Sequence, residues 1–321
     1  MICKESEKPV LYLVVPCYNE ESVLPETAKR LKEKLQQMAD SGLVHENSRI
    51  LFVDDGSRDK TWSIIEKCYR ENEQIEGLKL SHNRGHQNAL FAGLMTAKDV
   101  CDCAVSLDAD LQDDINALDG FLKEYLNGCD VVYGVRSKRE KDTFFKRTTA
   151  EGYYKFLKLL GVDIVYNHAD YRLMSHRALE ALAEYREVNL FLRGIVPLIG
   201  FKTGTVYYER HERFAGESKY PLKKMISFAF DGITSFSIKP LKIIGNIGII
   251  ISMFSVVALI YALISKLTGN AVAGWTAIIA SIWLLGGIQL LSLGIIGTYV
   301  GKIYSEVKDR PKYHIDAYLK K

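Results

Sequence analysis

The sequence CAVSLDADLQ, residues 103–112, joins an apolar run directly to two aspartates. Residues 103–107 have the composition of a buried strand, and Asp108 and Asp110 follow where that strand would leave its sheet. Two ionised carboxylates about 4 Å apart repel each other by roughly 4 kcal/mol at an effective dielectric constant near 20, so a bound cation would stabilise the pair. An exposed acidic turn that caps the next helix is the alternative interpretation of the same residues.

Apolar runs alternate with amphipathic segments along the first half of the chain. The runs that we predict to be strands are residues 10–16, 49–53, 78–81, 103–107 and 130–134. Strands that alternate with helices indicate an α/β domain with a mostly parallel, helix-covered sheet. In such a sheet, ligands bind beyond the carboxyl ends of the strands.

Polar clusters follow these predicted strands and should therefore converge on one edge of the sheet. The clusters are residues 18–20, 54–55, 83–86 and 108–112, together with Arg136, for which an ordinary surface cation is the alternative. A dinucleotide-binding Rossmann domain would need G-x-G-x-x-G after its first strand, and this chain has Cys-Tyr-Asn-Glu at 17–20. That departure argues against an oxidoreductase.

The composition excludes some classes of partner and compartment. Lys and Arg number 42 against 39 Asp and Glu, so the net charge of +3 does not favour nucleic-acid binding. The six cysteines form neither a C-x-x-C pair nor the framework of a disulfide-rich secreted domain, and reduced thiols suit the cytoplasm. The first eight residues are polar and do not read as a signal peptide.

The last third of the chain has the composition of a membrane-associated region. Residues 222–238 mix lysines with large apolar side chains, which suits helices on a membrane surface or, alternatively, ordinary amphipathic helices on the sheet. Residues 243–265 and 267–301 carry no charged side chain, and each tract is long enough to span a hydrocarbon core of roughly 30 Å. A buried pair of soluble helices is the alternative.

Lysine and arginine residues flank these two tracts unevenly. Lys239 and Lys242 precede the first tract, basic residues follow the second, and the short loop between them holds Lys266 alone. The positive-inside rule therefore predicts two membrane spans with both ends of the pair in the cytoplasm. Gly297 and Gly301 would permit close helix contact, either within the chain or in a homo-oligomer.

Taken in order, the motifs resemble those of the family 2 glycosyltransferases of GT-A fold. Within that family they are most similar to the polyprenyl-phosphate group, which includes bactoprenol glucosyltransferases and dolichyl-phosphate mannose synthases. The motifs are VVPCYNE at 14–20, VDDGS at 53–57, DADLQ at 108–112, YRLM at 171–174 and AGESKY at 215–220. The two closing apolar tracts extend the resemblance over nearly the whole chain.

The resemblance implies a role for each residue that matches a family motif. The residues implied to bind the nucleotide-sugar donor are Pro16, Tyr18, Glu20, Val53, Asp55, Asp108, Ala109 and Arg136. The residues implied to hold Mg²⁺ or Mn²⁺ are Asp108, Asp110 and Gln112, and oxygen ligands suit these hard cations. Arg213 and Lys219 match positions that contact phosphate, and Asp110 and Asp170 match catalytic positions.

The roles of Asp170 and His86 leave an alternative open. Asp170 matches a proposed catalytic base, but a phosphomonoester acceptor is already mostly dianionic at pH 7, so removing a proton from it contributes little. Asp170 could instead orient Arg172 or a sugar hydroxyl. His86 stands where many relatives have lysine, and an uncharged histidine there would not contact phosphate.

The sequence therefore predicts a membrane-anchored, inverting glycosyltransferase. Its regions would be a GT-A domain at 1–221, amphipathic interface helices at 222–240, two transmembrane helices at 241–301 and a basic cytoplasmic tail at 302–321. It would transfer a sugar from a nucleotide sugar, with uridine the favoured base, to undecaprenyl or another polyprenyl phosphate for cell-envelope glycosylation. The alternatives are a GT-A polysaccharide synthase and a non-catalytic membrane scaffold.

Overall fold

The structure is a computed structural model that describes residues 8–136, 168–188, 190–209, 239–268 and 274–321. The chain forms two compact units. The first comprises Met1–Glu151, Ile164–Lys219 and Arg310–Lys321, and the second comprises Gly152–Asp163 and Tyr220–Asp309. The predicted phosphate contacts Arg213 and Lys219 and the predicted interface helices at 222–238 lie outside the described residues.

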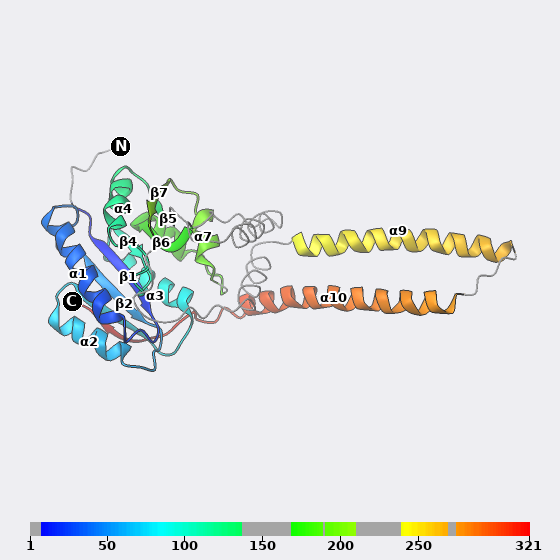
Figure 1. Cartoon of the computed structure of the whole chain (residues 1–321), viewed down its shortest axis with the longest axis horizontal. Helices are drawn as coiled ribbons and strands as arrows, with labels where there is room; N and C mark the ends of the chain where they lie inside the picture. Colours follow the sequence, from blue (N-terminus) through cyan, green and yellow to red (C-terminus); the bar gives the residue numbers. More distant parts are fainter. Residues whose placement is uncertain (1–7, 137–167, 189, 210–238, 269–273) are drawn as a thin grey trace. The chain divides into compact units, whose positions relative to one another are not determined.

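The first unit contains an eight-stranded sheet with the order β7-β5-β6-β4-β1-β2-β3-β8 (Figure 1). The strands are β1 (Leu11–Cys17), β2 (Arg49–Asp54), β3 (Ile75–Leu80), β4 (Cys103–Ser106), β5 (Val131–Arg136), β6 (His168–Ser175), β7 (Thr203–Tyr208) and β8 (Ile315–Leu319). Strands β1 to β4 are parallel to one another, as are β5 and β7. The prediction of a mostly parallel α/β sheet is confirmed.

Among the described strands, β6 is one of two departures from a purely parallel sheet, and the edge strand β8 is the other. Strand β6 lies between β4 and β5 and is antiparallel to both. Because Ser106 of β4 pairs with Arg172 of β6, the next residues outward bring Asp170 to the edge where Asp108 leaves β4. The antiparallel strand therefore contributes its beginning, rather than its end, to the edge where ligands bind in such sheets.

Helices cover both faces of the sheet. On one face, the core joins alternate residues of β1 and β2 to α1 (Leu24–Asp40) and α4 (Ala117–Leu126). Helix α1 has proline in its first turn and buries Leu24, Leu31 and Leu35 along one side, as an amphipathic helix should. The other face is covered by α3 (His86–Lys98), where Gly93 packs so closely on Val14 that a Cβ atom would lie 2.4 Å from its methyl carbon.

The C-terminal residues differ from the predicted basic tail. Residues 315–319 form β8, which pairs antiparallel with β3 and becomes one edge strand of the sheet. Tyr318 donates a hydrogen bond to the buried Glu76 at 3.0 Å, and Lys79 pairs with Asp316 at 2.9 Å. These pairings depend on residues more than 200 positions apart, which local composition does not reveal.

The second unit contains two long helices, α9 (Lys239–Leu267) and α10 (Trp275–Val307). Within the described residues, one stretch is long and apolar enough to cross a membrane: Leu284–Val307 of α10, with a mean hydropathy of 1.6. Its apolar side chains are largely exposed, unlike those of a soluble core helix, because only 6% of the stretch is buried.

Candidate active site

Asp108 and Asp110 lie in a turn directly beyond the carboxyl end of β4. Leu107 donates its backbone N–H to the carbonyl of Val14, which extends the pairing with β1 to the edge of the sheet. Leu111 adopts a left-handed backbone with φ of 56°, a strained conformation for a leucine that recurs at functional sites. Helix α4 begins only at Ala117, so neither aspartate caps it and the alternative of a helix-capping turn is wrong.

The setting of Asp108 disfavours its negative charge. Burial raises the pKa of Asp108 to about 6 against the opposing effect of His86, and the nearby carboxylates of Asp113, Asp170 and Asp110 act in the same direction as burial. The side chain is nevertheless 40% exposed, so a ligand can reach it. A partly exposed carboxylate in such a setting gains stability from a cation beside it.

His86 lies between Asp108 and a second carboxylate. It begins α3, and its Nε2 atom is 3.7 Å from Oδ1 of Asp108 and 3.7 Å from Oδ2 of Asp170. Burial alone would lower the pKa of His86, but the two carboxylates outweigh burial and raise the pKa above its usual 6.5. The imidazole therefore carries positive charge more readily than an isolated histidine.

Asp170 is the centre of a dense set of hydrogen bonds. Its Oδ1 atom accepts from Arg172 Nη2 at 2.6 Å and from Arg193 Nε at 3.1 Å. Its Oδ2 atom accepts from Arg193 Nη2 at 3.0 Å and from Gln87 Nε2 at 3.3 Å. Burial would raise the pKa of Asp170, but His86 and the two arginines hold it well below the usual value.

The loops after β1 and β2 meet beside this edge. Asp55 is buried, and its two carboxylate oxygens accept the backbone N–H groups of Arg84 at 2.7 Å and Gly85 at 2.9 Å. Gly56 has φ of +64°, and a Cβ atom there would lie 2.6 Å from the backbone of Asn83. Asp55 and Gly56 thus fix the loop that leads into His86.

The predicted nucleoside-pocket residues take three kinds of position. Pro16 and Val53 are buried and face each other in the register of β1 and β2. Tyr18 is 41% exposed and available to a ligand. Glu20 is half-buried, and Thr61 accepts a hydrogen bond from its backbone N–H.

Arg136 belongs to a second polar cluster at the end of β5. Its Nη2 atom is 3.3 Å from Oδ1 of Asp113, and the same oxygen accepts a hydrogen bond from the hydroxyl of Tyr208 at 2.6 Å. Asp113 is 7% exposed, so Arg136 is held by a buried carboxylate three residues beyond Asp110. Ala109 and Gln112 complete the intervening turn, and Gln112 donates its backbone N–H to Asp110.

Sequence reasoning missed three residues at this edge: Gln87, Arg193 and Asp113. Arg193 lies in α7 (Leu192–Leu198), and only the three-dimensional fold brings it to Asp170. One signal was available, because Asp170 and Arg172 are charged residues on the same face of an apolar strand and such a pair implies further polar partners.

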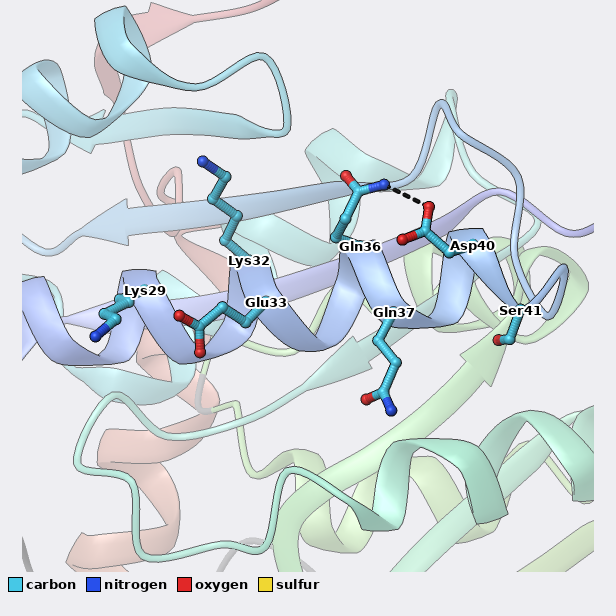
Figure 2. A pocket seen from close by; sticks show the side chains of 7 residues that line it. All are labelled: Lys29, Lys32, Glu33, Gln36, Gln37, Asp40 and Ser41. Atoms are coloured by element: carbon cyan, nitrogen blue, oxygen red, sulfur yellow. Dashed lines mark hydrogen bonds between the residues drawn. The ribbon is translucent and has the colours of Figure 1, made fainter.

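A shallow concavity elsewhere on the surface is not part of this site. It lies along α1, and Figure 2 shows that its lining side chains come from that helix and from Ser41, which directly follows it. They are Lys29, Lys32, Glu33, Gln36, Gln37, Asp40 and Ser41. None of the residues predicted from the motifs is among them.

The donor set can be tested against a divalent ion. Within the described ranges, no group of three or more His, Cys, Asp or Glu side chains is placed to enclose a metal by itself. Mg²⁺ usually takes one or two carboxylates and completes its coordination with water and substrate phosphates. Asp108 and Asp110 with the amide of Gln112 fit that shared mode of binding.

The mostly parallel sheet with an acidic D-x-D turn at its edge defines a glycosyltransferase of GT-A-like fold. The chain belongs to glycosyl transferase family 2, whose sequence profile matches residues 12–183, more than half of its length. The family assignment and the enzyme class predicted from the motifs are confirmed.

Several curated relatives match nearly the whole chain. The uncharacterized glycosyltransferase YkoT of Bacillus subtilis is 55% identical over 97% of this chain and 93% of that protein. The SfII prophage-derived bactoprenol glucosyl transferase of Shigella flexneri is 39% identical over 94% of this chain and 96% of that protein. Similarity of this extent covers the terminal helices as well as the catalytic unit.

A solved structure shows a more distant likeness. Glucosyl-3-phosphoglycerate synthase from Mycobacterium tuberculosis, in complex with Mn²⁺, uridine diphosphate and phosphoglyceric acid, is 16% identical. The match covers 70% of this chain and 76% of that one, with a TM-score of 0.43. A score of that size supports no transfer of ligands or residue roles.

Proposed function

We propose that this chain is an inverting glycosyltransferase that moves a sugar from a nucleotide sugar to a polyprenyl phosphate at the cytoplasmic face of a membrane. The observation that carries the proposal is the acidic turn of Asp108 and Asp110, partly exposed at the edge of the sheet beside His86. The bactoprenol glucosyl transferase of Shigella flexneri, similar over 94% of the chain, supports a lipid phosphate as acceptor.

Asp108 and Asp110, with Gln112, would hold Mg²⁺ or Mn²⁺, which when bound supplies a Lewis acid for the departing nucleoside diphosphate. The raised pKa of Asp108 supports this assignment, because a carboxylate in that setting is stabilised by a neighbouring cation. Ala109, between the two aspartates, is buried in the hydrophobic core beneath the turn.

The donor's nucleoside would lie over the loops after β1 and β2. Tyr18 offers an exposed aromatic face for stacking, and we assign Pro16, Glu20 and Val53 to the same pocket. Asp55 accepts one backbone N–H on each oxygen, and each oxygen of a carboxylate has a second lone pair for a further donor. Uridine is the base that we favour.

Arg136, Arg213 and Lys219 are the remaining candidates for phosphate contacts. Arg136 is anchored by Asp113 and Tyr208, which fixes its guanidinium near the end of β5. Arginine forms a bidentate fork that matches phosphate oxygens. An anchored fork loses little further conformational entropy on binding.

The connectivity of the chain supports two membrane spans. Strand β8 pairs with β3 of the catalytic unit, although α9 and α10 precede β8 in the sequence. If α10 alone crossed a bilayer, β8 would emerge on the side opposite to β3, and the two strands could not pair. If α10 crosses, this pairing calls for an even number of crossings, and α9, with 29 residues, is long enough to supply the other one.

The test is to incubate membranes that contain the full chain with undecaprenyl phosphate, Mn²⁺ and a panel of nucleotide sugars, and to identify the lipid product by mass. We expect a polyprenyl-phosphate sugar from one donor, and none from membranes that carry Asp108→Asn. Transfer only to water-soluble acceptors, or donor binding without any transfer, would refute the proposal. The same panel identifies the sugar and the base.

A further inference from the structure

The hydrogen bonds of Asp170 leave it poorly suited to act as a base. A carboxylate has about four lone-pair sites, and Asp170 accepts four hydrogen bonds, two from Arg193 and one each from Arg172 and Gln87. Its side chain is 8% exposed. A general base must accept a proton from the substrate, and every site for that proton on Asp170 already has a donor.

The two arginines that hold Asp170 differ in exposure. Arg172 is 2% exposed and donates its second amino group to the carbonyl of Leu192 at 3.1 Å, so it is a buried structural group. Arg193 is 41% exposed. Its guanidinium is held by Asp170 through Nε and Nη2, and it is exposed enough for a ligand to reach it.

The backbone that carries Arg193 is fixed by the same group of side chains. Leu192, the preceding residue, donates its N–H to Oε1 of Gln87 at 3.1 Å, and its carbonyl accepts from Arg172. Gln87 and Arg172 both also donate to Asp170. Asp170 therefore determines the orientation of Arg193 directly through the carboxylate and indirectly through the start of α7.

This arginine is held close to the acidic turn. A single imidazole, that of His86, separates Asp170 from Asp108, with 3.7 Å to each. In the proposed reaction the donor's diphosphate occupies the Asp108–Asp110 turn, and the phosphate of the acceptor must approach the same sugar carbon. Two sets of phosphate charge beside acidic side chains repel each other, and a fixed guanidinium offsets that repulsion.

We propose that Arg193 binds the phosphate of the lipid acceptor, and that Asp170 is a positioning residue for Arg193 and not the catalytic base. The inference rests on the proposed function and adds the group that receives the acceptor. No base is needed for this step. The phosphate oxygen forms a bond to the anomeric carbon, the bond from that carbon to the diphosphate breaks, and the nucleoside diphosphate leaves with the bonding electrons.

The experiment uses the full chain in detergent and measures binding separately from turnover. Calorimetry gives the dissociation constants of geranyl phosphate, as the acceptor probe, and of UDP or GDP with Mn²⁺, whichever the wild type binds. The variants are Arg193→Gln, Arg193→Lys and Asp170→Asn. The control variant is Arg177→Gln, because Arg177, on α6 (His176–Ala183), is an arginine that also pairs with an aspartate, Asp130. Thermal melts confirm that each variant is folded.

We expect Arg193→Gln to weaken geranyl phosphate binding about tenfold or more, as for loss of a charged hydrogen-bond donor, with the nucleotide constant within about twofold. Arg193→Lys should restore part of the affinity, because it keeps the charge but not the fork. Asp170→Asn should weaken acceptor binding as well, and the double variant should be little worse than either single one. Arg177→Gln should bind both probes like the wild type.

Three outcomes would overturn the inference. Unchanged acceptor affinity in Arg193→Gln would remove Arg193 from the acceptor site, and weakened nucleotide binding instead would place it on the donor phosphates. Asp170 would be a base if Asp170→Asn kept its acceptor affinity but lost the fall in kcat/KM at acid pH that the wild type shows. The proposed function fails separately, if the wild type binds geranyl phosphate through Arg193 yet forms no lipid-linked sugar.

Discussion

Arg172 and Asp170 form an ion pair across two positions of β6, with 2.6 Å between Nη2 and Oδ1 and both side chains buried. Removing Arg172 takes away the shortest ion pair of the buried Asp170 and the donor to the carbonyl of Leu192, while Arg193 still contacts the carboxylate. We predict that Arg172→Met lowers the free energy of unfolding by about 1–3 kcal/mol. Thermal or urea unfolding in detergent measures this loss.

The matched control for that prediction is Arg177→Met. Arg177 also pairs with an aspartate, Asp130, but its side chain is 64% exposed. An exposed ion pair contributes about 1 kcal/mol or less, so the control should unfold close to the wild type. Equal losses in the two variants would contradict a special contribution from the buried pair.

The lowered pKa of Asp170 predicts how its contribution to stability changes with pH. The folded-state pKa lies well below 3.8, so the stabilisation is complete above the unfolded-state pKa and is lost as pH falls through the folded-state value. Asp170→Asn should therefore be less stable than the wild type at pH 7, with a difference that narrows below about pH 4. A difference that grows toward acid pH would reverse the assigned direction.

Replacing either aspartate of the acidic turn should abolish metal-dependent turnover. We expect Asp108→Asn and Asp110→Asn to lose about 100-fold or more in kcat, because a bound metal contributes several kcal/mol of transition-state stabilisation. Chelation of the wild type should give a comparable loss that Mn²⁺ or Mg²⁺ restores. Asp99→Asn, a change of a 72% exposed side chain at the other end of α3, is the control. Full activity in Asp108→Asn would rule out the metal assignment.

The hydroxyl of Tyr208 should stabilise the cluster around Arg136. It donates to the buried Asp113 at 2.6 Å, and Tyr208→Phe would leave that carboxylate with one fewer donor. The expected loss is about 1–3 kcal/mol of unfolding free energy. Tyr207→Phe is the matched control, because the neighbouring Tyr207 is 71% exposed. A comparison of the two melting temperatures decides the point.

The edge strand β8 should contribute to the stability of the catalytic unit. Tyr318→Phe removes the hydrogen bond to Glu76, a carboxylate that is 1% exposed, and we expect a loss of about 1–3 kcal/mol. A chain that ends at residue 309 would also expose the unpaired edge of β3 and should aggregate more readily. Light scattering of the purified proteins measures this tendency, and a truncated chain as soluble as the full one would contradict the prediction.

The sequence predicted those parts of the fold that local patterns encode. Five strands were visible as apolar runs, and the polar residues after them, from Tyr18 to Asp108, lie at the strand ends of one sheet as expected. The position of β6 between β4 and β5 was not predictable in this way, because it depends on which distant strands pair. Arg193 was missed for the same reason, since its contact with Asp170 joins a helix to a strand 23 residues earlier.

The place of β8 in the sheet has a consequence for the order in which the protein is made. The ribosome synthesises β3 early, but its partner β8 emerges only after α9 and α10. While those two helices are being synthesised, the edge of β3 is therefore unpaired. The catalytic sheet is complete only once β8 has been made, so a ribosome that stalls before β8 should release a protein whose sheet remains open to other strands.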